Sequence, residues 1–130
     1  MKEETVMKFK NETHGFIYKT FIATNPYKLP APFLAASYLL SAEKELWKRS
    51  KRAFHRKQIF FDEIPRTGLS PYAFALLHLA QDIYTGSHYV TLRDVADPYL
   101  ISDKTFELVT EAIGLCREGY SRLGIGKQFN

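Results

Sequence analysis

Cysteine is almost absent from this sequence of 130 residues, which contains only Cys116. A single cysteine cannot form a disulfide within one chain, and it cannot supply the thiolates of a zinc site by itself. The first residues also lack the apolar segment and cleavage signal of a secretory leader, so we expect no secretion. These absences favour a reducing compartment. We therefore expect a cytoplasmic protein in which Cys116 is a buried, structural side chain.

Long hydrophobic runs are absent as well. The most apolar stretch, residues 30–42, is interrupted by Ser37, Tyr38 and Ser41. A membrane-spanning helix needs about 20 consecutive apolar residues. The stretch therefore predicts a helix that is apolar nearly all round, and we expect no membrane partner.

Aromatic side chains, by contrast, are plentiful. Ten Phe and eight Tyr contribute to an aromatic content of 15%, and 45% of the residues are hydrophobic. Such a composition supports a packed core and excludes a disordered chain, and the length fits one domain. We expect an all-α fold, a compact bundle of five to six helices in a single domain over residues 1–130. Residues 1–10 would form an extended arm and residues 124–130 a flexible tail.

Capping residues and prolines mark where these helices begin and end. The sequence predicts helices over residues 12–23, 33–41, 71–84 and 103–123, with a short one after Thr91. The expected N-caps are Asn11, Ser70, Thr91, and Ser102 or Asp103. Apolar spacing predicts that the first helix faces the core with Phe16, Ile17, Thr20 and Phe21. The same spacing gives the last helix a core stripe of Phe106, Val109, Ile113, Cys116, Tyr120 and Leu123. Residues 58–69 are compatible with either a short strand or a loop.

Positive charge is concentrated in one short run. Residues 43–57 hold seven Lys or Arg and two Glu, so they carry +5, whereas the whole chain carries only +4. Leu46, Trp47, Ser50, Ala53 and Phe54 recur at helical spacing within this run. The sequence therefore predicts one basic helix over residues 43–57, anchored by Trp47 and Phe54.

This basic helix is the main candidate for a binding site. Its candidate residues are Lys44, Lys48, Arg49, Lys51, Arg52, His55, Arg56 and Lys57. Such a face would dock on nucleic acid or on an acidic protein surface. A solvated surface helix, whose long aliphatic stems cover the core, explains the same pattern and remains an alternative.

A second element is a candidate for reading DNA. Residues 90–109 resemble the helix-turn-helix of the LacI-type repressors at Val90, Thr91, Leu92, Asp94, Val95, Ala96, Ile101, Ser102, Thr105 and Val109. The resemblance implies a helix that begins at Ser102 and enters the major groove, with Ser102, Lys104 and Thr105 as DNA-reading residues. A short helix packed against a longer one would give the same pattern for structural reasons.

A catalytic pair is a further alternative. His78 and Asp82 lie at i and i+4 of a predicted helix, a spacing that suits an acid–base pair in a small enzyme. No nucleophile accompanies them, so we expect no enzyme. No histidine pair has metal-ligand spacing, so we expect neither a metal nor another cofactor.

A family resemblance covers more of the chain. Residues 9–14, 36–41, 45–47, 68–70 and 79–84 resemble, in order and spacing, a family of small uncharacterised helical proteins of Gram-positive bacteria and their prophages. The resemblance implies a small cytoplasmic protein, often carried on mobile elements, and transfers no catalytic residue. Together with the basic run it suggests a non-enzymatic binding or regulatory protein, of which an inhibitor docking on a host nucleic-acid enzyme is one form. A homo-oligomer is compatible with the sequence.

Overall fold

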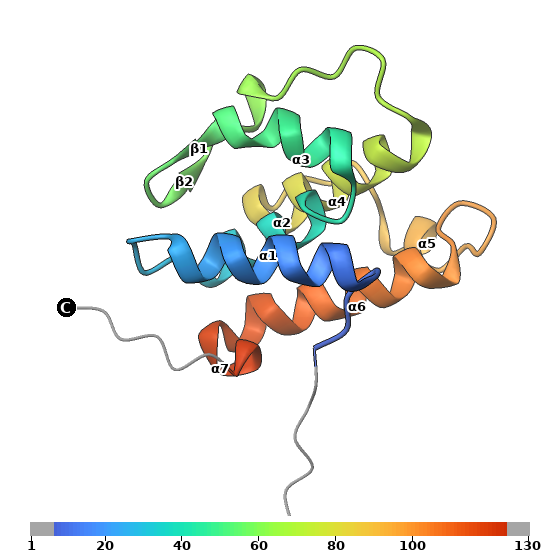
Figure 1. Ribbon diagram of the computed structural model, residues 1–130. Helices are drawn as coiled ribbons and strands as arrows, with labels where there is room; N and C mark the ends of the chain where they lie inside the picture. The colour runs from blue at the N-terminus through green and yellow to red at the C-terminus, as the bar shows by residue number, and fades with distance from the viewer. Residues whose placement is uncertain (1–6, 125–130) are drawn as a thin grey trace, which may run out of the picture.

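The computed structural model describes residues 7–124, which fold into seven α-helices, two 3-10 turns and one small hairpin (Figure 1). The helices are α1 (Glu12–Thr24), α2 (Ala31–Leu40), α3 (Lys44–Ser50), α4 (Pro71–Thr85), α5 (Leu92–Val95), α6 (Asp103–Glu118) and α7 (Tyr120–Leu123). The 3-10 turns are η1 (Lys51–Ala53) and η2 (Phe61–Glu63). The hairpin pairs β1 (Phe54–His55) antiparallel with β2 (Gln58–Ile59). The described part is thus largely α-helical, as expected, but the hairpin makes it more than a helical bundle.

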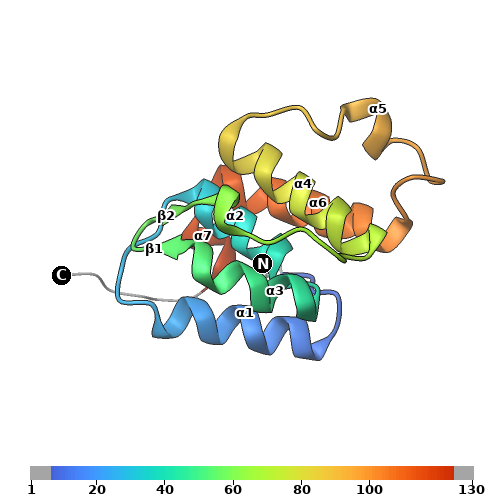
Figure 2. The same cartoon turned by 90° about the horizontal axis from the view of Figure 1, so that it is seen from above.

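Helix α2 forms the centre of the fold. Its sequence is apolar on every side, and residues 33–40 are all buried. It packs against both α4 and α6, while α1 and α3 lie side by side on the outside (Figure 2). No helix within residues 7–124 has the length and apolar character needed to cross a membrane.

The predicted N-caps are confirmed. The Asn11 side chain accepts a hydrogen bond from the His14 N–H at 2.8 Å, and the Ser70 hydroxyl accepts one from Ala73 at 3.1 Å. Thr91 and Asp94 form a reciprocal capping box at the start of α5. Each cap satisfies backbone N–H groups that have no partner within the helix.

The predicted core face of α1 is only partly right: Ile17 and Phe21 pack against the core, whereas Phe16 and Thr20 are exposed. Phe16 is 72% exposed, whereas His14, Tyr18 and Ile22 are buried. The Tyr18 hydroxyl donates to the Leu34 carbonyl at 2.8 Å, and the His14 ring bonds to the Tyr38 carbonyl at 2.9 Å. Two polar side chains therefore belong to the core because α2 offers them hydrogen-bond partners.

The last helix is also shorter than predicted. It breaks at Gly119, whose φ of 63° and ψ of −139° no helix allows. Phe106 and Ile113 of the predicted core stripe are about half exposed, while Glu111 is buried. Glu111 reaches the interior because it pairs with Arg122 of α7 at 2.9 Å.

The expected arm and tail are only partly described. Residues 1–6 and 125–130 lie outside the described residues. Residues 7–10 contain no helix, and the Lys8 carbonyl accepts a hydrogen bond from the Tyr38 hydroxyl. The segment therefore lies against the core through Met7 and Phe9.

Candidate functional site

The basic run does not form one helix. Helix α3 ends at Ser50, and the chain continues through η1 into the hairpin, so the prediction of a helix over residues 43–57 is wrong. Phe54 fits the helical spacing, yet its backbone is extended, with φ of −87° and ψ of 114°. The positive charges therefore lie on three consecutive elements: α3, η1 and the hairpin turn.

Aromatic packing explains why the chain leaves the helix. The Phe54 ring lies 5.1 Å from that of Phe21, 5.5 Å from that of Phe33 and 5.4 Å from that of Trp47. Phe21 and Trp47 also meet edge to face at 5.0 Å. Ring–ring contacts of this kind stabilise the fold beyond the contribution of buried apolar area alone. The cluster, made by α1, α2, α3 and β1, fixes the base of the hairpin.

The turn of the hairpin holds a strained arginine. Arg56 and Lys57 form a two-residue connection between the paired residues His55 and Gln58. Arg56 has a φ of +57°, and it is the one non-glycine residue with a positive φ in residues 7–124. Left-handed backbone costs a side-chain-bearing residue about 1–2 kcal/mol, and such strain concentrates at functional sites.

Two of the predicted binding residues have structural partners. The Arg49 guanidinium bonds to Glu45 at 3.0 Å and to the carbonyls of Pro65 and Thr67 at 3.1 and 2.7 Å. It thereby ties α3 to the loop before α4. His55 Nε2 lies 2.7 Å from Glu63, and its ring packs edge-on against Phe60. Neither side chain is fully available to a ligand.

The remaining cations form what we call the basic surface. All six side chains are exposed, and none takes part in an ion pair with another residue of the described range 7–124: Lys44, Lys48, Lys51, Arg52, Arg56 and Lys57. Unpaired charges of one sign on one surface raise the local positive potential. Six of the eight predicted residues are thus exposed and without an ion pair on α3, η1 and the hairpin turn.

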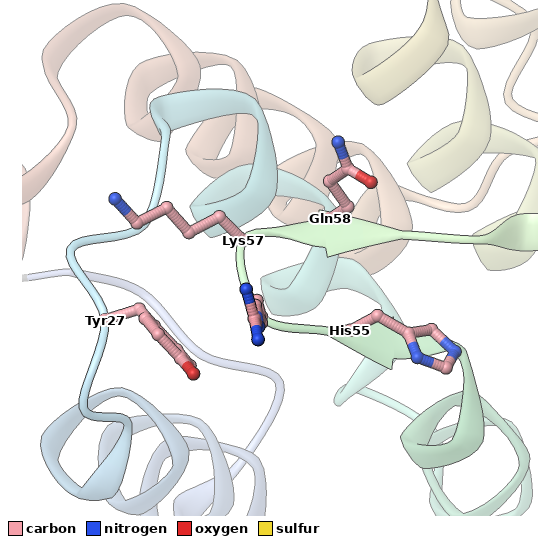
Figure 3. A pocket seen from close by; sticks show the side chains of 5 residues that line it. Tyr27, His55, Lys57 and Gln58 are labelled. Atoms are coloured by element: carbon pink, nitrogen blue, oxygen red, sulfur yellow. The ribbon is translucent and has the colours of Figure 1, made fainter.

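A cavity of about 520 Å³ opens beside the hairpin turn, and we call it the hairpin pocket. Tyr27, His55, Arg56, Lys57 and Gln58 line it (Figure 3). Tyr27 comes from the link between α1 and α2, and its side chain lies beside the turn, whereas the His55 ring points away from it (Figure 3). Tyr27 was not predicted to be a site residue, because nothing in the sequence around it indicates that the hairpin turn lies beside it.

A second cavity, of about 260 Å³, lies between α1 and α3, and we call it the apolar groove. Its lining residues are Phe16, Ile17, Thr20, Phe21, Trp47 and Lys51. Most of them are the α1 residues that the sequence analysis assigned to the core. The groove is therefore an apolar surface with a cation of the basic surface at its edge.

The candidate catalytic pair has another role in the fold. The Asp82 carboxylate accepts hydrogen bonds from the Ser87 hydroxyl at 2.7 Å and from the N–H groups of Tyr89 and Val90 at 2.9 and 2.7 Å. His78 instead stacks on the Tyr89 ring at 4.7 Å. Burial, and then the charge of Arg66, lower the pKa of His78. Asp82 thus organises the segment after α4, and a catalytic role for the pair stays an untested prediction.

The candidate DNA-reading residues lie at the start of α6. Ser102 caps the helix, and its hydroxyl donates to that of Thr105 at 3.1 Å. Thr105 is only 3% exposed, so its hydroxyl is not presented to a base edge, whereas Lys104 is exposed. Helix α5, which would precede the recognition helix, is a single turn. The helix-turn-helix resemblance also remains an untested prediction.

Thiol and metal chemistry have little support in the described residues. Cys116 is half-buried rather than fully buried, and burial raises the pKa of its thiol, which disfavours the reactive thiolate. Within residues 7–124, no three His, Cys, Asp or Glu side chains gather closely enough to hold a metal ion.

No family model, curated protein or solved structure matches this chain. The evidence for a function therefore comes from the basic surface, the hairpin pocket and the apolar groove.

Proposed function

We propose that this is a non-enzymatic nucleic-acid-binding protein that docks on phosphate groups through the basic surface. The observation that carries the proposal is the set of six exposed, unpaired cations on α3, η1 and the hairpin turn. Each Lys or Arg that neutralises a phosphate releases condensed counterions, which favours binding at low salt. Cations already paired with carboxylates of the protein would release far fewer counterions from the nucleic acid on binding.

The charge distribution also favours one orientation of the protein relative to the nucleic acid. Residues outside 43–57 carry a net charge of −1, and the exposed side chains at the start of α6 include Asp103 and Glu107. These carboxylates repel phosphates. The protein therefore approaches nucleic acid with α3 and the hairpin, and α6 points away from it.

An acidic protein surface is the second candidate partner, and the apolar groove favours it. A phosphate group gains nothing from contact with an apolar surface. An apolar side chain of an acidic protein partner would fit beside Phe16 and Trp47, and Lys51 would pair with one of its carboxylates. An inhibitor of a host nucleic-acid enzyme, encoded by a phage or mobile element, would be one protein of this type.

A charge-reversal experiment tests the nucleic-acid proposal. The variant Lys48→Glu/Lys51→Glu/Arg52→Glu changes the basic surface, and the matched control Arg93→Glu/Lys104→Glu/Arg117→Glu makes the same change of net charge at exposed positions elsewhere. Affinity is measured by fluorescence anisotropy with labelled single- and double-stranded oligonucleotides at low salt. We expect a loss of at least tenfold for the first variant and a much smaller loss for the control.

Three results would overturn or redirect the proposal. If the wild-type protein binds neither oligonucleotide, nucleic acid is not the partner, and the acidic protein surface becomes the candidate. Equal losses in the two variants would mean that only the net charge matters. A larger loss in the control, which removes Lys104, would favour the helix-turn-helix alternative.

A further inference from the structure

We infer that the hairpin pocket is a subsite for one unpaired nucleotide, with its base against the Tyr27 ring and its phosphate between Arg56 and Lys57. This inference rests on the proposed function, because the basic surface would hold the rest of the strand. It adds a preference for single strands, which the cations alone do not provide.

The size and lining of the pocket suit such a ligand. Small-molecule sites commonly measure roughly 300–1,000 Å³, and the pocket of about 520 Å³ falls within that range. Its lining includes one aromatic ring, that of Tyr27, and two cations, Arg56 and Lys57, and no carboxylate lines it. An aromatic ring accepts any base by stacking, and cations accept the phosphate.

The two sides of the pocket are held in place before any ligand binds. The Tyr27 N–H donates to the Asn25 side chain at 2.9 Å, and Pro26 restricts the backbone between them. On the other side, Ile59 is buried, and its N–H donates to the Tyr84 hydroxyl at 3.1 Å. The backbone of both walls is therefore fixed before binding, so that only side chains remain to be ordered by the ligand.

The strained turn is explained by the same ligand. Glycine or asparagine would adopt the φ of +57° more easily than arginine does. An arginine at this position is accounted for if its guanidinium is needed for a phosphate at the edge of the pocket. Lys57, next along the turn, extends on the same side as Tyr27 (Figure 3).

The pocket would accept only a base that is unpaired. In a duplex both faces of every internal base are covered by neighbours, so a tyrosine ring cannot stack on one without unstacking it. A duplex therefore reaches the cations only, whereas a single strand reaches the cations and Tyr27. Stacking of one base contributes about 1–3 kcal/mol, which corresponds to roughly a 5- to 150-fold preference.

Abasic oligonucleotides test the subsite directly. We would compare a single-stranded oligonucleotide with an abasic strand of the same length and backbone charge, using anisotropy at fixed salt. The wild-type protein should bind the strand with bases at least fivefold more tightly. Tyr27→Ala should remove this preference and leave the affinity for the abasic strand unchanged, while Tyr27→Phe should keep it. Tyr27 is 38% exposed, and unfolding curves of both variants check that they are folded.

The outcomes separate this inference from the proposed function. Equal binding of the two strands by the wild-type protein would overturn the subsite and leave phosphate docking intact. A preference that survives in Tyr27→Ala would place base contacts elsewhere and also overturn it. If neither strand binds, the proposed function and the subsite fall together.

Discussion

The Arg122 guanidinium occupies the space that a side chain at Gly114 would fill. A Cβ built at Gly114 would lie closer to the guanidinium carbon than van der Waals contact allows. The guanidinium is held there by Glu111 at 2.9 and 3.2 Å and by Glu118 at 3.1 Å. Gly114 thus provides the space in which α7 is fastened to α6, with the buried carboxylate of Glu111 as the anchor.

Gly114→Ala should destabilise the protein although alanine favours helices. The gain in helix propensity is about 1 kcal/mol, whereas losing the partner of a buried carboxylate outright costs about 3–5 kcal/mol, and displacing a flexible guanidinium costs part of that. We expect a net loss of at most about 2–4 kcal/mol in the free energy of unfolding, measured by urea denaturation.

A double-mutant cycle supplies the control. In an Arg122→Ala background the guanidinium is gone, so adding Gly114→Ala should be neutral or stabilising. The relationship would be refuted if the alanine cost the same in both backgrounds.

His14 should make the protein less stable in acid. Burial lowers the pKa of His14 to about 4, from an ordinary value of 6.5, and the nearby charge of Lys10 acts in the same direction. The unfolded state therefore binds a proton at higher pH than the folded state does. The stabilisation is complete above pH 6.5 and is lost as the pH falls towards 4, by about 3 kcal/mol in total.

Unfolding free energies measured between pH 7 and pH 4 test this prediction. His14→Gln should flatten the curve, and the exposed His88→Gln is the matched control that should leave most of it in place. A His14→Gln protein with the wild-type slope would contradict the assignment.

The corrected face of α1 predicts a sharp contrast between two apolar substitutions. Phe16 is 72% exposed and Ile22 is fully buried. Phe16→Ala should therefore change the unfolding free energy by less than about 0.5 kcal/mol, and Ile22→Ala should lower it by about 2–5 kcal/mol. Similar losses at the two positions in urea denaturation would restore the face predicted from spacing.

Arg56→Gly should stabilise the fold and weaken binding. Glycine relieves the left-handed strain, and we expect a gain of up to about 1 kcal/mol in unfolding free energy. The same change removes a cation from the basic surface and should lower oligonucleotide affinity severalfold. A loss of stability, or unchanged affinity, would argue against a strained functional arginine.

Local signals in the sequence predicted the helix starts. Asn11, Ser70 and Thr91 each accept a hydrogen bond from the backbone N–H group three residues later. The local sequence is therefore enough to predict where these helices begin. The face of α1 could not be predicted this way, because His14 and Tyr18 are buried only where α2 supplies carbonyl acceptors.

The cations of the candidate site could be predicted from the sequence, but the backbone conformation that carries them could not. The charge of residues 43–57 is a property of the sequence, and it identified the six cations of the basic surface. Phe54 continues the helical spacing, so the sequence predicted a helix where a cluster of rings from α1, α2 and α3 favours extended backbone. Tyr27 lies beside the site only because the chain leaves the helix and forms the hairpin.

The salt dependence of oligonucleotide binding tests the central claim most directly. If all six cations contact phosphates of a single strand, the logarithm of the association constant should fall against the logarithm of salt concentration with a slope of about −4. The variant Lys48→Glu/Lys51→Glu/Arg52→Glu should reduce the slope to about −2. A slope near zero for the wild-type protein, or the same slope in both proteins, would contradict docking through the basic surface.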